Sequence, residues 1–182
     1  MLAGLVRKQK LLDHLWATAE VCAFVCAALK KHGVELNSDL AEGAALLHDI
    51  DKALPPDDPY RALGHGAGGA QWLIDHGYEE LAPAVRDHPV NVIGTATSYE
   101  DWEAATTLEG RLVAYADKRC HQAVVSLDQR FERWYARYPD NPMEPLAHER
   151  FRRLEAELCA MAGITPQDVR RLAWVAQATA AL

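Results

Sequence analysis

The sequence is poor in cysteine, in basic residues and in long apolar runs, and each shortage excludes a class of protein. Its 182 residues include four cysteines, and none of them forms a CxxC pair. A disulfide framework or a zinc–thiolate site is therefore not expected. Cys22 and Cys26 fall on the apolar face of one expected helix, which predicts buried free thiols in a reducing cytoplasm.

The charge balance and the hydropathy exclude two further classes of protein. The formal net charge is −7, whereas a general nucleic-acid-binding protein normally carries a basic face. No apolar run approaches the ~20 residues of a membrane span, and the charged residues Asp13 and Glu20 argue against a signal peptide. With 49% hydrophobic and 25% charged residues, the composition predicts one globular domain over residues 1–182.

Helical periodicity runs along almost the whole chain. Apolar residues recur every three to four positions between Leu11 and Leu29, and an Asn-Ser-Asp cluster caps a second helix at 37–49. Prolines make 54–59 a loop, and 89–105 is the longest irregular stretch, which often indicates a lid or binding loop. The further helices are expected at 65–77, at 79–87, at 106–138 with a bend, at 146–162 and at 166–181. The prediction is an all-α fold.

The residues that could carry chemistry centre on the adjacent pair His48-Asp49, which ends an apolar helical run. Neighbouring helical side chains diverge by about 100°, so two of them rarely share a packing role but can approach a metal from different sides. Asp117 lies in the middle of an otherwise apolar helix, where a carboxylate needs a cation or hydrogen-bond partners. Taken alone, His14 is better explained as a satisfied core or boundary histidine than as a metal ligand.

Two further features suit a phosphate-bearing ligand. Lys52 follows Asp49 by three residues. His65 lies between Gly64 and Gly66, whose lack of a side chain allows close backbone approach and exposes amide groups. The glycine-rich segment could equally be a flexible turn. The charged stretch from Arg130 to Arg137 is expected to be a solvated helix face.

The ordered series His14, His48-Asp49, His65, His88 and Asp117 resembles the ligand set of the HD superfamily of metal-dependent phosphohydrolases. The resemblance covers about residues 8–125, and the helices of about 126–182 are expected to pack on this helical bundle. The Gly64 and Asp117 motifs look most like those of the bacterial YqeK-type enzymes, which hydrolyse diadenosine tetraphosphate symmetrically at a di-iron centre. In contrast to the His-Asp-x-Gly-Lys pattern of many relatives, this chain carries Asp51 in place of the glycine.

The resemblance implies that Asp49 bridges two ions, with His14, His48 and Asp117 on one and His65 and His88 on the other. The implied reaction is attack of a metal-activated water on a phosphoester or phosphoanhydride of a nucleotide or dinucleoside polyphosphate. Asp49 and Lys52 are then the expected catalytic residues. The residues expected to bind substrate phosphates are Lys52, Gly64, Gly66 and Arg119.

Mixed histidine and carboxylate ligation favours a divalent transition metal such as iron or manganese over magnesium alone. The expected partner is a small phosphorylated molecule and neither a membrane nor nucleic acid, and the sequence leaves a homodimer open. Two other functions also remain open: a di-iron oxygenase of the HD type, and a non-catalytic nucleotide sensor that keeps the fold and the metal.

Overall fold

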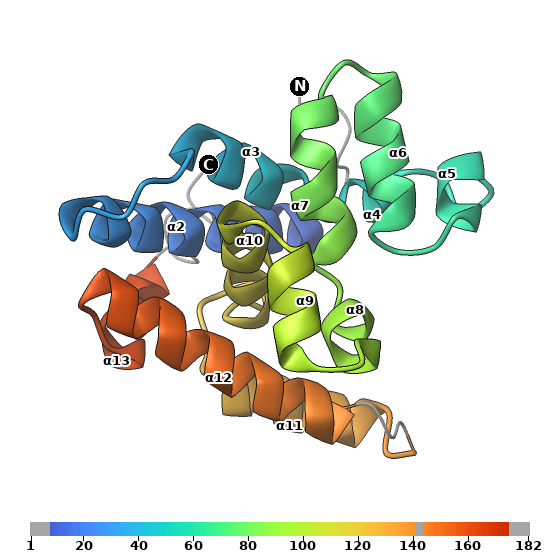
Figure 1. Ribbon diagram of the computed structural model, residues 1–182. Coiled ribbons are helices and arrows are strands. Elements are labelled where there is room, and N and C mark those ends of the chain that lie inside the picture. The colour runs from blue at the N-terminus through green and yellow to red at the C-terminus, as the bar shows by residue number, and fades with distance from the viewer. Residues whose placement is uncertain (1–7, 141–143, 175–182) are drawn as a thin grey trace.

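The computed structural model describes residues 8–140 and 144–174 as a set of packed helices (Figure 1). No β-strand occurs in these two ranges, which contain only an isolated bridge between Cys120 and Val124. The predicted all-α fold is confirmed. The four free cysteines are buried, as predicted.

Three helices form the centre of the molecule: α2 (Gln9–Lys31), α3 (Ser38–Leu47) and α10 (Leu108–Lys118). Each of them packs against the other two. Helix α3 begins where the Asn37 side chain accepts a hydrogen bond from the Leu40 amide at 3.1 Å, as the capping cluster predicted. Together these helices bury a continuous apolar core that includes Val21, Leu29, Ala44, Leu112 and Val113.

Helix α2 requires one correction to the sequence analysis. Its 23 residues are long and apolar enough to cross a membrane by length and composition, although no such segment was expected. Of its most apolar window, 56% is buried inside the fold, and it packs against α3, α10 and α12 (Glu144–Ala162). In this structure α2 therefore serves as a core helix of the bundle.

The segment after α3 turns sharply and carries several short helices. These are α4 (Ile50–Ala53), α5 (Pro59–Ala62), α6 (Ala67–Asp75), the 3₁₀ turn η1 (Glu79–Leu81) and α7 (Ala82–Asp87). Gly66 precedes α6 with φ +83°, and a Cβ there would lie 2.6 Å from Pro89 and 2.9 Å from the Arg86 carbonyl oxygen. Glycine at this position lets the turn approach the end of α7 closely.

Two predicted features of the second half are wrong. The stretch 89–105 is not irregular, because it folds into α8 (Val90–Thr95) and α9 (Tyr99–Ala105). The helix expected over 106–138 is two helices, since α10 ends at Lys118 and α11 runs from Leu127 to Arg137. A Ser126–Gln129 capping box starts α11 anew.

The C-terminal helices cover one side of the core. Helix α12 packs against α2, α8, α10 and α11 and runs along the lower edge of the molecule (Figure 1). It is followed by α13 (Pro166–Arg170) and the 3₁₀ turn η2 (Arg171–Trp174). The remainder of the helix expected at 166–181 lies outside the described residues.

Candidate metal centre

A first cluster of donor atoms forms where α2, α10 and the α3–α4 junction meet. His14 lies on α2, Asp117 on α10, and His48 and Asp49 occupy the junction, His48 at the C-cap of α3 and Asp49 at the N-cap of α4. His14 Nε2 is 3.1 Å from His48 Nε2 and 3.1 Å from Asp117 Oδ1. Asp49 Oδ2 lies 3.6 Å from His14 Nε2 and 3.7 Å from His48 Nε2. The helix break at His48-Asp49 thus aims both side chains at one point.

A second cluster adjoins the first through the other oxygen of Asp49. Asp49 Oδ1 is 3.4 Å from His65 Nε2 and 3.7 Å from His88 Nε2, and the two imidazole nitrogens are 3.2 Å apart. His65 precedes α6, and His88 is the C-cap of α7. The carboxylate of Asp49 therefore faces both clusters, one oxygen to each.

The tautomers of three histidines are fixed by main-chain oxygens. The Nδ1 hydrogens are donated to carbonyl oxygens: His14 to His121 at 2.7 Å, His48 to Ala45 at 2.7 Å and His88 to Val85 at 2.6 Å. A carbonyl oxygen can only accept, so the proton is on Nδ1 and the lone pair is on Nε2. All three Nε2 lone pairs consequently point into the clusters.

His65 is oriented by a side chain instead. Its Nδ1 lies 3.0 Å from Asp51 Oδ2, and the Asp51 side chain is buried. This carboxylate occupies the glycine position of the His-Asp-x-Gly-Lys pattern described above. The replacement is visible in the sequence, and a carboxylate that accepts a hydrogen bond from the second ring nitrogen of a metal-binding histidine is common.

The carboxylates of the clusters are held ionised. Burial would raise the pKa of Asp49, but its electrostatic interactions with His48, Lys52 and His14 hold it well below its usual range. Burial opposes ionisation of Asp117 too, and its pKa is likewise held well below the usual range, chiefly by Lys118. The buried Lys118 ammonium pairs with Asp117 Oδ2, which leaves Oδ1 for the cluster.

The chemistry of these donors fits metal ions. The Nε2 atoms of His14 and His48 lie 3.1 Å apart, and those of His65 and His88 lie 3.2 Å apart. Two nitrogen lone pairs at such distances repel each other unless a cation lies between them. Asp49 Oδ1 is buried and pairs with the Lys52 ammonium at 2.7 Å, and it also faces His65 and His88. The close approach of these lone pairs, with one oxygen of Asp49 facing each pair, favours ligation at two adjacent positions.

Comparison with known families identifies the fold that carries this site. Residues 11–120 match the HD domain family, and every residue of the two clusters lies within that range. The chain belongs to the HD domain family. No curated protein and no solved structure matches it. An HD domain with these buried histidine and aspartate clusters is a metal-dependent phosphohydrolase, and the adjacent clusters agree with the binuclear centres typical of HD domains.

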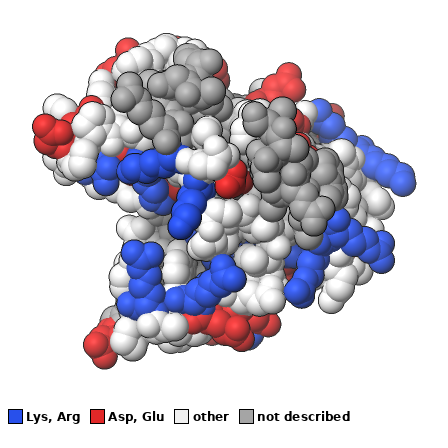
Figure 2. All heavy atoms as spheres, turned by 180° about the vertical axis from the view of Figure 1, so that it is seen from behind, with Lys and Arg blue, Asp and Glu red and all other residues white. Residues whose placement is uncertain are grey.

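A cavity of about 310 Å³ opens over the HD centre. Its lining includes His14 and Asp49 from the clusters, and four cationic side chains surround them: Lys8, Lys10, Lys52 and Arg130. Viewed from behind, Lys and Arg side chains stand on both sides of a hollow in the surface (Figure 2). This concentration of positive charge contrasts with the net charge of −7 for the whole chain.

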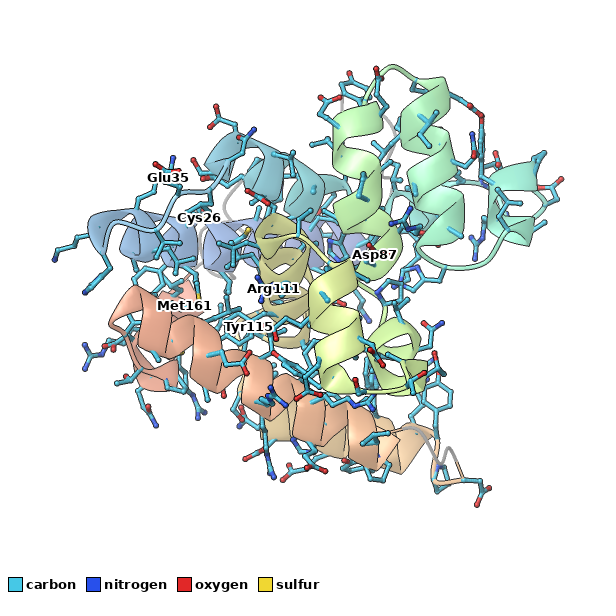
Figure 3. The ribbon with its side chains drawn as sticks, viewed as in Figure 1. Cys26, Glu35, Asp87, Arg111, Tyr115 and Met161 are labelled. Carbon is cyan, nitrogen blue, oxygen red and sulfur yellow. The ribbon has the colours of Figure 1, made fainter. Side chains whose placement is uncertain are left out.

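Not every residue expected to bind substrate lies at this HD centre. Gly64 and Gly66 flank His65 beside the second cluster, both with positive φ. Arg119 is 1% exposed, and its guanidinium donates to the Tyr115 hydroxyl, the Glu155 carboxylate and the carbonyl oxygens of Val125 and Pro166. Tyr115 faces α12 from α10 (Figure 3).

The expectation that Arg119 binds phosphate is therefore corrected. Its donors are directed to groups that tie α10 to α12 and to the start of α13, and no nitrogen is left to face the cavity. The turn after α10 directs Arg119 inward, whereas Arg130, further along the chain, lines the cavity.

Proposed function

We propose that the protein hydrolyses a phosphoester or phosphoanhydride of a nucleotide or dinucleoside polyphosphate. One observation carries the proposal: two donor clusters that share Asp49 lie beneath a cavity ringed by cationic side chains. Bound ions would lower the pKa of a coordinated water and withdraw charge from phosphoryl oxygens. We expect iron or manganese, because imidazole and carboxylate donors together suit these ions better than magnesium alone.

The residues of the centre have distinct roles in this proposal. His14, His48 and Asp117 would hold one ion, His65 and His88 would hold the other, and Asp49 would contribute an oxygen to each. Lys52 is 46% exposed at the edge of the cavity, where its ammonium is positioned to bind a phosphate oxygen and stabilise charge that develops there. A single well-placed electrostatic donor of this kind typically contributes about 3–4 kcal/mol.

The cavity supports a substrate with several phosphates. Lys8 and Lys10 add positive charge beyond Lys52 and Arg130, which is more than one phosphate group requires. A volume of 310 Å³ is at the low end of the range of about 300–1,000 Å³ for small-molecule sites. We infer that the cavity holds the phosphate chain while the nucleoside lies nearer the surface. Symmetrical cleavage of diadenosine tetraphosphate, as in the YqeK-type enzymes, agrees with this arrangement.

The test is metal analysis of protein purified without oxygen, combined with hydrolysis assays on nucleoside monophosphates, triphosphates and diadenosine polyphosphates. We expect two ions per chain, release of phosphorylated products with manganese alone, and loss of activity in His48→Ala and His65→Ala. Arg137→Met is the matched surface control. Absence of hydrolysis across the panel, or oxygen consumption by the iron-loaded protein in its place, would overturn the proposal.

A further inference from the structure

Arg130 lies at the metal centre although it belongs to a helix outside the part of the chain that matches the HD family. The match ends at residue 120, and Arg130 lies on α11. Its Nη2 is 3.7 Å from Asp117 Oδ1, the same oxygen that faces His14 and His48. The expectation of a solvated face over 130–137 is therefore wrong at its first residue, whose side chain is 14% exposed.

The guanidinium of Arg130 is packed against a neighbouring side chain and forms no close hydrogen bond with Asp117. Its plane lies against Trp134, one turn further along α11, with Cζ 5.1 Å from the ring centroid. Its Nε is buried and has no hydrogen-bond partner within the described residues. The contact of 3.7 Å with Asp117 is too long for a hydrogen bond. Arg130 lines the cavity, so its guanidinium lies where a ligand in the cavity can reach it.

The charge around Asp117 also points to an anion. The buried Lys118 ammonium already neutralises Oδ2 of this carboxylate, and an ion ligated by Oδ1 would neutralise the rest. The partly buried guanidinium of Arg130 would then lie beside another positive charge, which is unfavourable unless an anion compensates it. A phosphate oxygen provides that compensation, and the planar fork of arginine suits it better than lysine.

We propose that Arg130 binds a phosphate group of the substrate beside the ion position formed by His14, His48 and Asp117. Helix α11 thereby adds to the HD centre a substrate-binding residue from outside the range that matches the family. This inference rests on the proposed function for the presence of a phosphorylated substrate. Its chemistry can nevertheless be tested with inorganic phosphate alone.

The experiment is calorimetric titration of inorganic phosphate into the full chain loaded with manganese, and into the metal-free chain. The variants are Arg130→Met, Arg130→Lys and the matched control Arg137→Met, which removes an exposed arginine from the same helix. We expect Arg130→Met to weaken phosphate binding by about 10- to 100-fold, the effect of losing a charged hydrogen bond. Arg130→Lys should recover part of this loss, and Arg137→Met should bind as the wild type does.

Metal content and steady-state kinetics separate the binding role from a structural one. We expect Arg130→Met to keep both ions with wild-type affinity and to raise KM more than it lowers kcat. Wild-type phosphate affinity in Arg130→Met would overturn the inference, as would loss of the ion beside Asp117, because Arg130 would then act by positioning that ligand. Phosphate binding that depends on Arg130 in a protein without hydrolytic activity would refute the proposed function alone.

Discussion

Removal of the Asp51 carboxylate should weaken one of the two ion positions and leave the other intact. Asp51 Oδ2 lies 3.0 Å from Nδ1 of His65, whereas the other three cluster histidines donate to main-chain oxygens. Asp51 is consequently the only one of the four orienting acceptors that a substitution can delete. Asp51→Gly introduces the residue of the common family pattern, and Asp51→Asn keeps the shape and one acceptor oxygen.

The magnitude follows from the role of this contact. Loss of an outer-shell partner typically costs about 10- to 100-fold in metal affinity, which corresponds to about 1.4–2.7 kcal/mol. We expect Asp51→Gly to show this loss at the position formed by His65, His88 and Asp49. Asp51→Asn should lose less, because its amide oxygen can still accept from His65. The position of His14, His48 and Asp117 should be unaffected, since its acceptors remain.

The assay is a calorimetric titration of the metal-free protein with manganese. The wild type should bind two ions per chain, and Asp51→Gly should retain tight binding of one while the second weakens. Asp57→Asn, an exposed carboxylate in the following loop, provides the control. Equal weakening of both ions, or no weakening of either, would refute the assignment of Asp51 to His65.

Three further predictions follow from the contacts of the site. Asp49→Ala should reduce metal occupancy at both ion positions, whereas His65→Ala should reduce it at one, measured as bound ions per chain. Equal loss of ions in the two variants would contradict the sharing of Asp49. In the metal-free protein, burial lowers the pKa of His88 to about 4, below the value of about 6.5 for an unfolded histidine. The unfolded state therefore binds more protons than the folded state, and the free energy of unfolding should fall by about 3 kcal/mol as pH drops from 6.5 to 4. Denaturant titrations of His88→Gln should show a weaker dependence of this free energy on pH. An unchanged pH dependence in His88→Gln would refute the assignment to His88. Arg119→Met removes the cationic partner of the Glu155 carboxylate and leaves it only the Tyr115 hydroxyl, so the free energy of unfolding should decrease by about 3–5 kcal/mol. An altered phosphate affinity would contradict the structural role of Arg119.

The ligand set could be anticipated from the sequence because its chemistry is local. A histidine next to an aspartate at a helix end, and an aspartate inside an apolar helix, have few explanations other than metal binding or a buried polar network. The order of these residues along the chain then indicated the HD fold. Their three-dimensional convergence adds what no spacing could give, namely which oxygen of Asp49 faces which imidazole.

The role of Arg130 could not be anticipated, because it depends on a change of direction that lacks the usual helix-breaking residues. Residues 119–126 contain neither glycine nor proline, and the chain turns there through the Arg119 side chain and a bridge between Cys120 and Val124. The available sign was the Ser126–Gln129 capping box, which marks a new helix start. Without that break, Arg130 would lie on a continuous helix, about 20 Å along its axis from Asp117.

The main-chain acceptors of His14, His48 and His88 also affect how the protein can evolve. A substitution changes a side chain but leaves the carbonyl oxygens of His121, Ala45 and Val85 where the helices hold them. Neighbouring positions can therefore diverge widely without disturbing the direction of these three imidazoles. Asp51 is the exception, because the orientation of His65 depends on a hydrogen bond to this one side chain, which a substitution can remove. Among related chains, the ion position formed by His65 and His88 should accordingly be lost earlier than the position formed by His14, His48 and Asp117.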